Sequence, residues 1–347
     1  MAKLQQSHKE VARKCLGLIK MGGRVSARAM KLSEYLNKKP VIKVLCFGEG
    51  KTGKTTFVTD VFNLIDKGYH IIYIDCDKSM NIIFNQAAKF KHLDKVDYFQ
   101  LRDEQHITIL PFVNALISKC DFYYNEHTGE VVNDARLLKN RGQFTCIHAS
   151  RIDEHTIIIL DSLTAFAESM FNKLREKQLY VMGSFDKDKL YNGQVQQYYG
   201  VLSTEFFEFL DRLSNLAASV FVISHTKTVE RKNKAGEVIE RKIYPLSTTI
   251  NASEALSKYF DECLYFYSRA GKYYVSAQAT SEVCGIGGRQ LEPKIYQSSE
   301  LTPSIILQKY NHQLDEVPIH DIKLIESETP EPASNSVIAL TSNKLTI

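Results

Sequence analysis

Short apolar runs alternate along the chain with segments of helical periodicity. Four runs are nearly continuously apolar, as strands buried on both faces are: 41–47, 71–74, 156–160 and 220–224. Four segments repeat apolar residues at helical spacing: 54–66, 104–119, 164–178 and 195–217. Strands that alternate with helices predict an α/β fold whose mostly parallel sheet is covered by helices on both faces.

Turn signals predict additional short elements. Residues 122–132 alternate around His127-Thr128-Gly129, which indicates a hairpin. Residues 226–244 form a charged loop or hairpin with Gly236 near its tip. A short helix is expected over 252–259, followed by strands at 262–267 and 272–277 that turn at 269–271.

Charge and composition divide the chain into three parts. Residues 1–40 carry ten Lys or Arg and two Glu, a net charge of +8, whereas the other 307 residues sum to −4. This part is predicted to be a basic helical N-terminal arm, followed by a core at 41–300 and a C-terminal extension at 301–347. The extension is Pro-, Ser- and Thr-rich from about 326, which predicts disorder there. The basic arm suggests an anionic partner, nucleic acid before membrane; the alternative is a solvated helix surface.

The overall composition excludes several classes of protein. With 44% hydrophobic and 24% charged residues in 347, the chain is neither disordered throughout nor fibrous. It has no apolar run near the ~18–20 residues of a membrane span, and its first residues do not resemble a secretory signal. Its seven cysteines form no CxxC pair, so neither a zinc site nor a disulfide framework is indicated. A cytoplasmic protein is therefore expected.

The strongest chemical signal is a phosphate-binding loop between a predicted strand and a predicted helix. Residues 48–55 read GEGKTGKT, a full match to GxxxxGK[ST]. The glycines let backbone N–H groups wrap a phosphate chain, Lys54 reaches the β and γ phosphates, and the Thr55 hydroxyl binds Mg²⁺. ATP and Mg²⁺ are the expected cofactors. The predicted binding set is Gly48, Glu49, Gly50, Lys51, Thr52, Gly53, Lys54, Thr55 and Thr56.

Polar residues at the ends of three other strands complete a predicted active site. Asp161 ends the strand at 156–160 and is expected to hold Mg²⁺; it or Ser162 could instead cap the next helix. Asp75 and Asp77 are two apart, so in an extended chain they share a face, and either could activate water or be a structural cap. His225 ends the strand at 220–224, where it could sense the γ-phosphate or be structural.

The order of these motifs resembles that of the RecA-like ATPases, particularly the phage-encoded RecA-like proteins, some of which act in single-strand annealing. The motifs are GEGKTGKTT, IIYIDCD, TIIILDSLT and VFVISHT, with Gln196 to Gly200 also similar to the phage group. The resemblance covers roughly residues 40–290. It assigns water activation to Asp77, the Asp-Ser pair after the Walker B strand to Asp161-Ser162, and the sensor pair to Ser224-His225.

The resemblance implies a RecA-like P-loop NTPase core that hydrolyses ATP with Mg²⁺ and assembles into a homo-oligomeric ring or filament. It implies work on DNA in recombination, single-strand annealing or replication support, in the host cytoplasm if the protein is phage-encoded. Two departures matter: Asp stands at 77 where RecA commonly has Glu, and His at 225 where RecA has Gln. Strand exchange is therefore not implied, and the basic arm has no counterpart.

The resemblance also suggests contacts outside the pocket. The loop after the sensor strand contacts DNA in such recombinases; here it spans Thr226 to Tyr244 and could instead be a solvated hairpin. Its cations, opposed by three Glu, are Lys227, Arg231, Lys232, Lys234, Arg241 and Lys242. A cation supplied by the adjacent subunit could be Lys272 or Arg289, although Arg289 fits a surface turn equally well.

Other P-loop classes fit less well. No NKxD motif for guanine occurs, and a partition-type ATPase would need a lysine where Glu49 stands. A small-molecule P-loop kinase remains an alternative, as does a nucleotide-dependent loading module with little turnover.

Overall fold

The described part of the chain begins at Pro40. The structure is a computed structural model, and it describes residues 40–104, 106–138, 141–182, 192–310 and 324–325. These residues belong to one unit of the chain, which starts at Pro40. The predicted arm at 1–40, apart from its last residue, and the tail from about 326 lie outside the described residues, so those two expectations stay untested.

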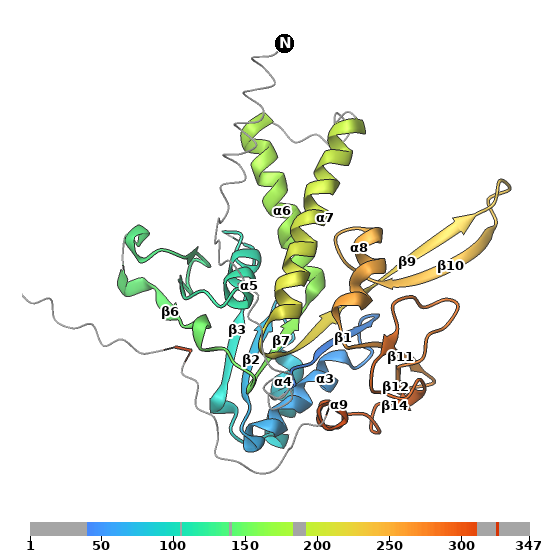
Figure 1. The fold of residues 1–347 in the computed structure, drawn as a ribbon, viewed down its shortest axis with the longest axis horizontal. Helices are drawn as coiled ribbons and strands as arrows, with labels where there is room; N and C mark the ends of the chain where they lie inside the picture. Colours follow the sequence, from blue (N-terminus) through green and yellow to red (C-terminus); the bar gives the residue numbers. More distant parts are fainter. Residues whose placement is uncertain (1–39, 105, 139–140, 183–191, 311–323, 326–347) are drawn as a thin grey trace, which may run out of the picture. The chain divides into compact units, whose positions relative to one another are not determined.

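The centre of this unit is a nine-stranded sheet (Figure 1). Its strands are β1 (Lys43–Gly48), β2 (His70–Asp75), β3 (Val96–Gln100), β7 (Thr156–Asp161), β8 (Ser219–Ser224), β11 (Glu262–Arg269), β12 (Lys272–Ser276), β13 (Gly287–Gly288) and β14 (Ile295–Gln297). Their order is β14-β12-β11-β1-β8-β7-β2-β3, with β13 on β11. The strands from β11 to β3 are parallel, and β12, β13 and β14 pair antiparallel. The prediction of a mostly parallel sheet is confirmed.

Two apolar layers cover the sheet, because successive residues of each buried strand point to opposite faces. Val44 and Cys46 of β1 face one layer, and Leu45 and Phe47 face the other. The first layer contains α3 (Lys54–Thr59), the 3₁₀ helix η1 (Asp60–Lys67) and α9 (Pro303–Lys309). The second contains α5 (Ile109–Ile117), α6 (Leu163–Met182), α7 (Asn192–Asn215) and α8 (Ile250–Ala255). Burial on both faces explains why these strands are apolar without alternation.

Two smaller sheets confirm the predicted hairpins. Strands β4 (Phe122–Tyr124) and β5 (Val131–Val132) pair across the expected turn, and β6 (Thr145–Ile147) adds a third strand. Strands β9 (Thr226–Lys232) and β10 (Val238–Pro245) form a long antiparallel ribbon that extends away from the central sheet (Figure 1). The remaining short helices are α4 (Met80–Gln86), η2 (Ala87–Lys89), η3 (Leu93–Lys95), η4 (Ala135–Leu137), η5 (Arg141–Gln143), η6 (Ala149–Arg151) and η7 (Leu256–Tyr259).

Two boundaries differ from the sequence-based prediction. The helix expected from 104 begins only at Ile109, because the Asp103 carboxylate accepts the backbone N–H groups of Thr108 and Ile109 at 2.8 and 2.9 Å. The core does not end at residue 300. Leu301, Ile306 and Leu307 are buried in the layer beside α3, so the segment through α9 is part of the core rather than of an extension.

Candidate functional site

The phosphate-binding loop joins β1 to α3 as the sequence predicts. Gly48 lies so close to β11 that a Cβ there would come within 2.2 Å of the Phe266 carbonyl oxygen. Gly53 caps α3 with a φ of +90°, a conformation that favours glycine. The sequence therefore needs glycine at both positions to bend the chain from the strand into the helix.

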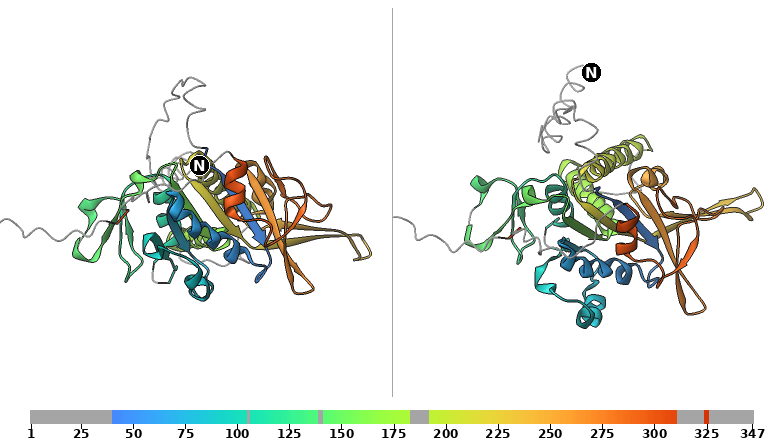
Figure 2. Two further views of the ribbon diagram at one scale, coloured as in Figure 1. Left: turned by 90° about the horizontal axis from the view of Figure 1, so that it is seen from below. Right: turned by 60° about the horizontal axis from the view of Figure 1, so that its bottom comes forward.

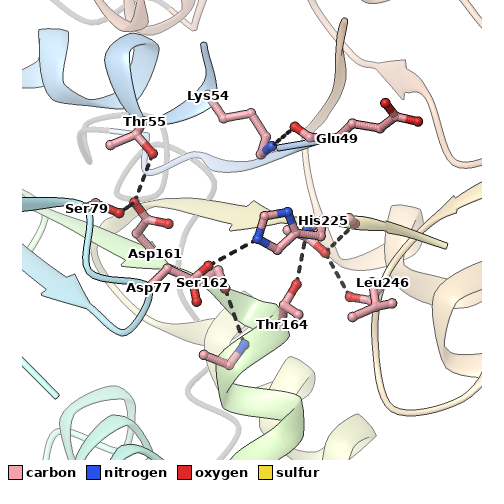
Figure 3. A network of polar contacts seen from close by, with 12 residues as sticks. Glu49, Lys54, Thr55, Asp77, Ser79, Asp161, Ser162, Thr164, His225 and Leu246 are labelled. Carbon is pink, nitrogen blue, oxygen red and sulfur yellow. Dashed lines mark hydrogen bonds and ion pairs between the residues drawn. The ribbon is translucent and has the colours of Figure 1, made fainter. Parts of the chain in front are cut away.

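Lys54 is folded back into this loop. Its ammonium is buried and donates to the carbonyl oxygen of Gly48 at 2.9 Å. It also donates to that of Glu49 at 2.6 Å (Figure 3). Burial lowers the pKa of Lys54, whereas the nearby Asp161 carboxylate acts to raise it. The ammonium is thus held at the mouth of a loop whose backbone can receive a phosphate chain.

Asp161 accepts hydrogen bonds from hydroxyl groups of three separate segments. Its Oδ2 accepts from Tyr73 of β2 at 2.8 Å. It also accepts from Thr55 of α3 at 3.1 Å and from Ser79 at 2.6 Å, as Figure 3 shows. The side chain is almost fully buried, and burial raises the pKa of Asp161 in spite of these bonds. A carboxylate in this position binds a cation readily, because a bound cation compensates the buried charge.

The donor set fits magnesium. The Thr55 hydroxyl and the Asp161 carboxylate are hard oxygen donors 3.1 Å apart. No group of three or more His, Cys, Asp or Glu in the described part of the chain could hold a metal. Mg²⁺ characteristically uses one or two protein ligands together with water and phosphate oxygens, so this sparse set suits it.

Asp75 and Asp77 have different surroundings. The strand ends at Asp75, whose buried Oδ1 accepts the N–H groups of Asp77 and Ser79 at 3.0 and 3.1 Å. Its other oxygen accepts from Tyr98 at 2.5 Å, and Arg102 lies 3.8 Å away. Asp75 therefore shapes the turn, and of the two acids it is Asp77 that lines the pocket. The expectation of a shared face was wrong, because the chain turns after Asp75.

His225 and Asp77 form a pair across the pocket. His225 Nε2 lies 3.3 Å from Asp77 Oδ2, and the His225 backbone N–H donates to Thr164 Oγ1 at 3.0 Å (Figure 3). Burial acts to raise the pKa of Asp77, but hydrogen bonds from His225 and Ser162 and the charges of His225 and Arg102 lower it overall. Ser224, the other sensor residue, points to the Leu246 carbonyl at 2.8 Å instead.

Five of the side chains described above line one pocket of about 890 Å³. It brings together Lys54, Thr55, Asp77, Asp161 and His225, which the sequence had placed on three predicted strands and one loop. Sequence reasoning missed Tyr73, Ser79, Tyr273 and the start of α9. Of these, only Tyr73 leaves a signal, as a phenol within an otherwise aliphatic strand; the others reach the pocket through tertiary packing.

The predicted DNA-contacting cations occupy the β9–β10 ribbon and its tip. Paired residues share a face, so Lys227, Arg231 and Lys242 lie on one side of the ribbon and Lys232 and Arg241 on the other. Each side also carries one glutamate, and Lys242 pairs with Glu240 at 3.0 Å. Lys227, Arg231, Lys232 and Arg241 are exposed, Lys242 is partly exposed, and Lys234 is exposed in the turn between the strands.

The two candidate cations for a neighbouring subunit lie at opposite ends of β11. Lys272 is exposed at the tip of the β11–β12 hairpin, beyond the end of β1 that carries the phosphate-binding loop. Arg289 lies beside the start of β11, where it pairs with Asp261 at 2.9 Å. Neither is among the residues that line the pocket of this chain.

Comparison with known proteins gives a family for most of the chain. A family model described as "AAA domain" matches residues 41–285. No curated protein matches the chain. Among solved structures, the RadB recombinase is similar with a TM-score of 0.34 and 9% sequence identity, over 69% of this chain and 80% of that one. None of the described helices is long and apolar enough to span a membrane.

The environment of Asp161 predicts a change in stability. In the nucleotide-free protein, Asp161→Asn should raise the free energy of unfolding at pH 7 by about 1 kcal/mol, a typical gain for a single stabilising substitution. The substitution removes a buried charge but keeps an oxygen that accepts from Tyr73 and Ser79. Urea unfolding followed by circular dichroism measures the difference.

The raised pKa of Asp161 makes the stability difference between the variant and the wild type depend on pH. The pKa of Asp161 is raised in the folded state, so the folded wild type binds more protons than the unfolded chain within the shifted range. Wild-type stability should fall as pH rises through that range, and the advantage of Asp161→Asn should vanish below about pH 4. A variant less stable than the wild type at pH 7 would contradict this account.

Proposed function

The chain belongs to the AAA domain family, and from this membership and the geometry of the pocket we propose that it is a Mg²⁺-dependent ATPase that acts on DNA. The observation that carries the proposal is the pocket itself. Lys54, Thr55 and Asp161 line the side where a P-loop holds phosphates, and the Asp77–His225 pair lines the same pocket. A phosphate site and a held carboxylate base are the two parts that hydrolysis needs.

Each residue has a role that its contacts support. Lys54 would exchange the carbonyl oxygens of Gly48 and Glu49 for phosphate oxygens. Thr55 and Asp161 would hold Mg²⁺, which supplies charge neutralisation on the phosphates when bound. Asp77 would orient the attacking water and accept its proton, because its lowered pKa keeps it ionised.

His225 would position Asp77. Its imidazole lies 3.3 Å from the carboxylate, and its own backbone is fixed by Thr164 at 3.0 Å. A movement of the strand end at β8 would therefore move the base. This arrangement supports a sensor role for His225 in the same proposal.

The finer proposal is that of a phage-encoded RecA-like protein in the host cytoplasm, serving recombination, single-strand annealing or replication support. The motif order supports it, and the cationic ribbon supports single-stranded DNA as the partner. A homo-oligomer, ring or filament, would bring Lys272 or Arg289 of one subunit to the pocket of the next. Both cations are exposed on this chain, which is what such a contact requires.

Turnover tests the proposal directly. ATP hydrolysis should require Mg²⁺, increase when single-stranded DNA is added, and rise per subunit with protein concentration if a neighbour completes the site. Transfer of phosphate to a small acceptor without DNA stimulation would instead identify a kinase. Tight ATP binding with negligible turnover under every condition would identify a loading module.

The Asp77–His225 pair predicts a change in the pH profile. Asp77→Ala should abolish hydrolysis but retain ATP binding. His225→Ala should shift the acidic limb of kcat/KM to higher pH, since it removes the bond and charge that lower the pKa of Asp77 and leaves the burial that raises it. ATP itself titrates over the same pH range, but it does so equally for both enzymes. The ratio of the variant rate to the wild-type rate at each pH therefore removes its contribution. An unmoved limb would remove His225 from this role.

The ribbon predicts strongly salt-dependent binding of single strands. Log affinity should fall against log salt with a slope near −0.7 for each phosphate contact, and replacing three contacting cations by glutamine should reduce that slope by roughly 2. One triple variant, Lys227→Gln/Arg231→Gln/Lys242→Gln, tests the first side. The other, Lys232→Gln/Lys234→Gln/Arg241→Gln, tests the second side together with the turn. Lys294→Gln, another exposed lysine, is the control. Affinity that barely changes between low and moderate salt would refute the ribbon as the DNA contact.

A further inference from the structure

One face of the β11–β12 hairpin combines tyrosines with cations. Directly paired residues share a face, and the pairs are Tyr267 with Tyr274 and Arg269 with Lys272. Tyr265 lies two residues before Tyr267 on β11 and therefore on the same face. We call Tyr265, Tyr267 and Tyr274 the tyrosine row; Arg269 and Lys272 continue it to the tip of the hairpin.

The three rings of the tyrosine row are stacked on one another. The centroids of Tyr265 and Tyr267 are 5.7 Å apart with an interplanar angle of 18°, and those of Tyr267 and Tyr274 are 5.4 Å apart at 20°. Phe47 lies 5.4 Å from Tyr265 and ties the row to the core. The row is thus a rigid, ordered set of parallel aromatic rings.

The hairpin that carries the tyrosine row extends beyond the end of the neighbouring strand β1. The pairing of β1 with β11 ends at Gly48 and Phe266, so Tyr267 and Tyr274 lie past the end of β1. All three rings of the row remain partly exposed. The hairpin tip projects beyond the neighbouring strands in both views of Figure 2, as the orange ribbon.

The opposite face of the same hairpin serves the nucleotide pocket. Tyr273 points to that side, lines the pocket, and would be 3.7 Å from a Cβ at Gly53. Alternation along β12 thus gives adjacent tyrosines to two surfaces. The tyrosine row belongs to the surface that the phosphate-binding site does not use.

The charges around the row favour an anionic partner. Arg269 and Lys272 share its face, and Arg241 of the ribbon acts on Tyr265 from β10. Burial raises the pKa of Tyr265, the Glu49 and Glu282 carboxylates act in the same direction, and Arg241 acts to lower it. Three cations therefore surround the row against two carboxylates, and the row lies beside the predicted DNA-contacting ribbon.

We propose that the tyrosine row binds the bases of single-stranded nucleic acid, with Arg269, Lys272 and Arg241 neutralising the adjoining phosphates. This inference rests on the proposed function, because it assigns a surface to the DNA partner. Stacked aromatic rings with neighbouring cations accept any base through its π-face, so the contact is independent of sequence. Phosphate contacts alone do not need an ordered row of rings.

The test separates base stacking from phosphate binding. Tyr267→Leu and Tyr274→Leu should each weaken binding of an oligothymidylate by about 10-fold in the absence of nucleotide. Their affinity for an abasic deoxyribose-phosphate oligomer of the same length should not change. Tyr273→Leu, on the opposite face of the same strand, is the matched control and should change neither affinity.

A second measurement does not depend on losing a side chain. The chain has no tryptophan, so Tyr274→Trp introduces a single reporter. Its emission should be quenched by oligothymidylate and not by the abasic oligomer. Fluorescence that responds equally to both oligomers would overturn the proposal.

The remaining outcomes distinguish this inference from the proposed function. If the wild type binds no single-stranded DNA, the DNA part of the proposed function fails and the inference fails with it. If DNA binds and stimulates hydrolysis while the leucine variants match the wild type, only the tyrosine row is refuted. Leucine variants that lose self-association in light scattering but keep full DNA affinity would assign the row to a second copy of the chain and overturn the proposal.

Discussion

The buried carboxylate of Asp161 is the interaction on which the rest of the site depends. A single oxygen of this side chain accepts hydroxyl groups from α3, from β2 and from the turn after β2. These three elements carry the phosphate-binding loop, the adjoining strand and Asp77, the proposed catalytic carboxylate. Because a buried charge is costly unless it is compensated, the carboxylate fixes where these elements meet.

Ser79 extends this constraint to the turn that holds Asp77. Its hydroxyl donates to Asp161 at 2.6 Å and its backbone N–H donates to Asp75 at 3.1 Å. The residue that ends the turn holding Asp77 is therefore hydrogen-bonded to two buried carboxylates. Under the proposed mechanism, a cation bound by Asp161 would weaken the hydrogen bond from Ser79, and this bond would couple metal binding to the position of Asp77.

The sequence predicts those features that are determined by neighbouring residues. It predicts less well those that depend on contacts between distant parts of the chain. The apolar strands, the glycine-rich turn and the strand-end acids at 77 and 161 follow from periodicity and motif, and the structure places both acids in the predicted pocket. The sequence does not predict that Asp75 and Asp77 have different surroundings, because the contacts of Asp75 come from Tyr98 and Arg102, more than twenty residues away. Strand β3 was missed because its edge position leaves it half-exposed and without a continuous apolar run. The sequence predicts an extension from Leu301, because the few apolar residues of this segment are recognised as core only once they pack beside α3.

The β11–β12 hairpin shows why such surfaces escape motif analysis. Its alternating pattern reads as an ordinary strand pair, and nothing in the residue order says that Tyr273 and Tyr274 serve different surfaces. The two surfaces separate because the pairing of β11 with β1 ends at Phe266. The rest of the hairpin therefore lies beyond the end of β1. One side then lies over the phosphate-binding loop while the other presents stacked rings and cations. Under the proposed function, one hairpin would contact a nucleotide on one face of the sheet and a nucleic acid on the other.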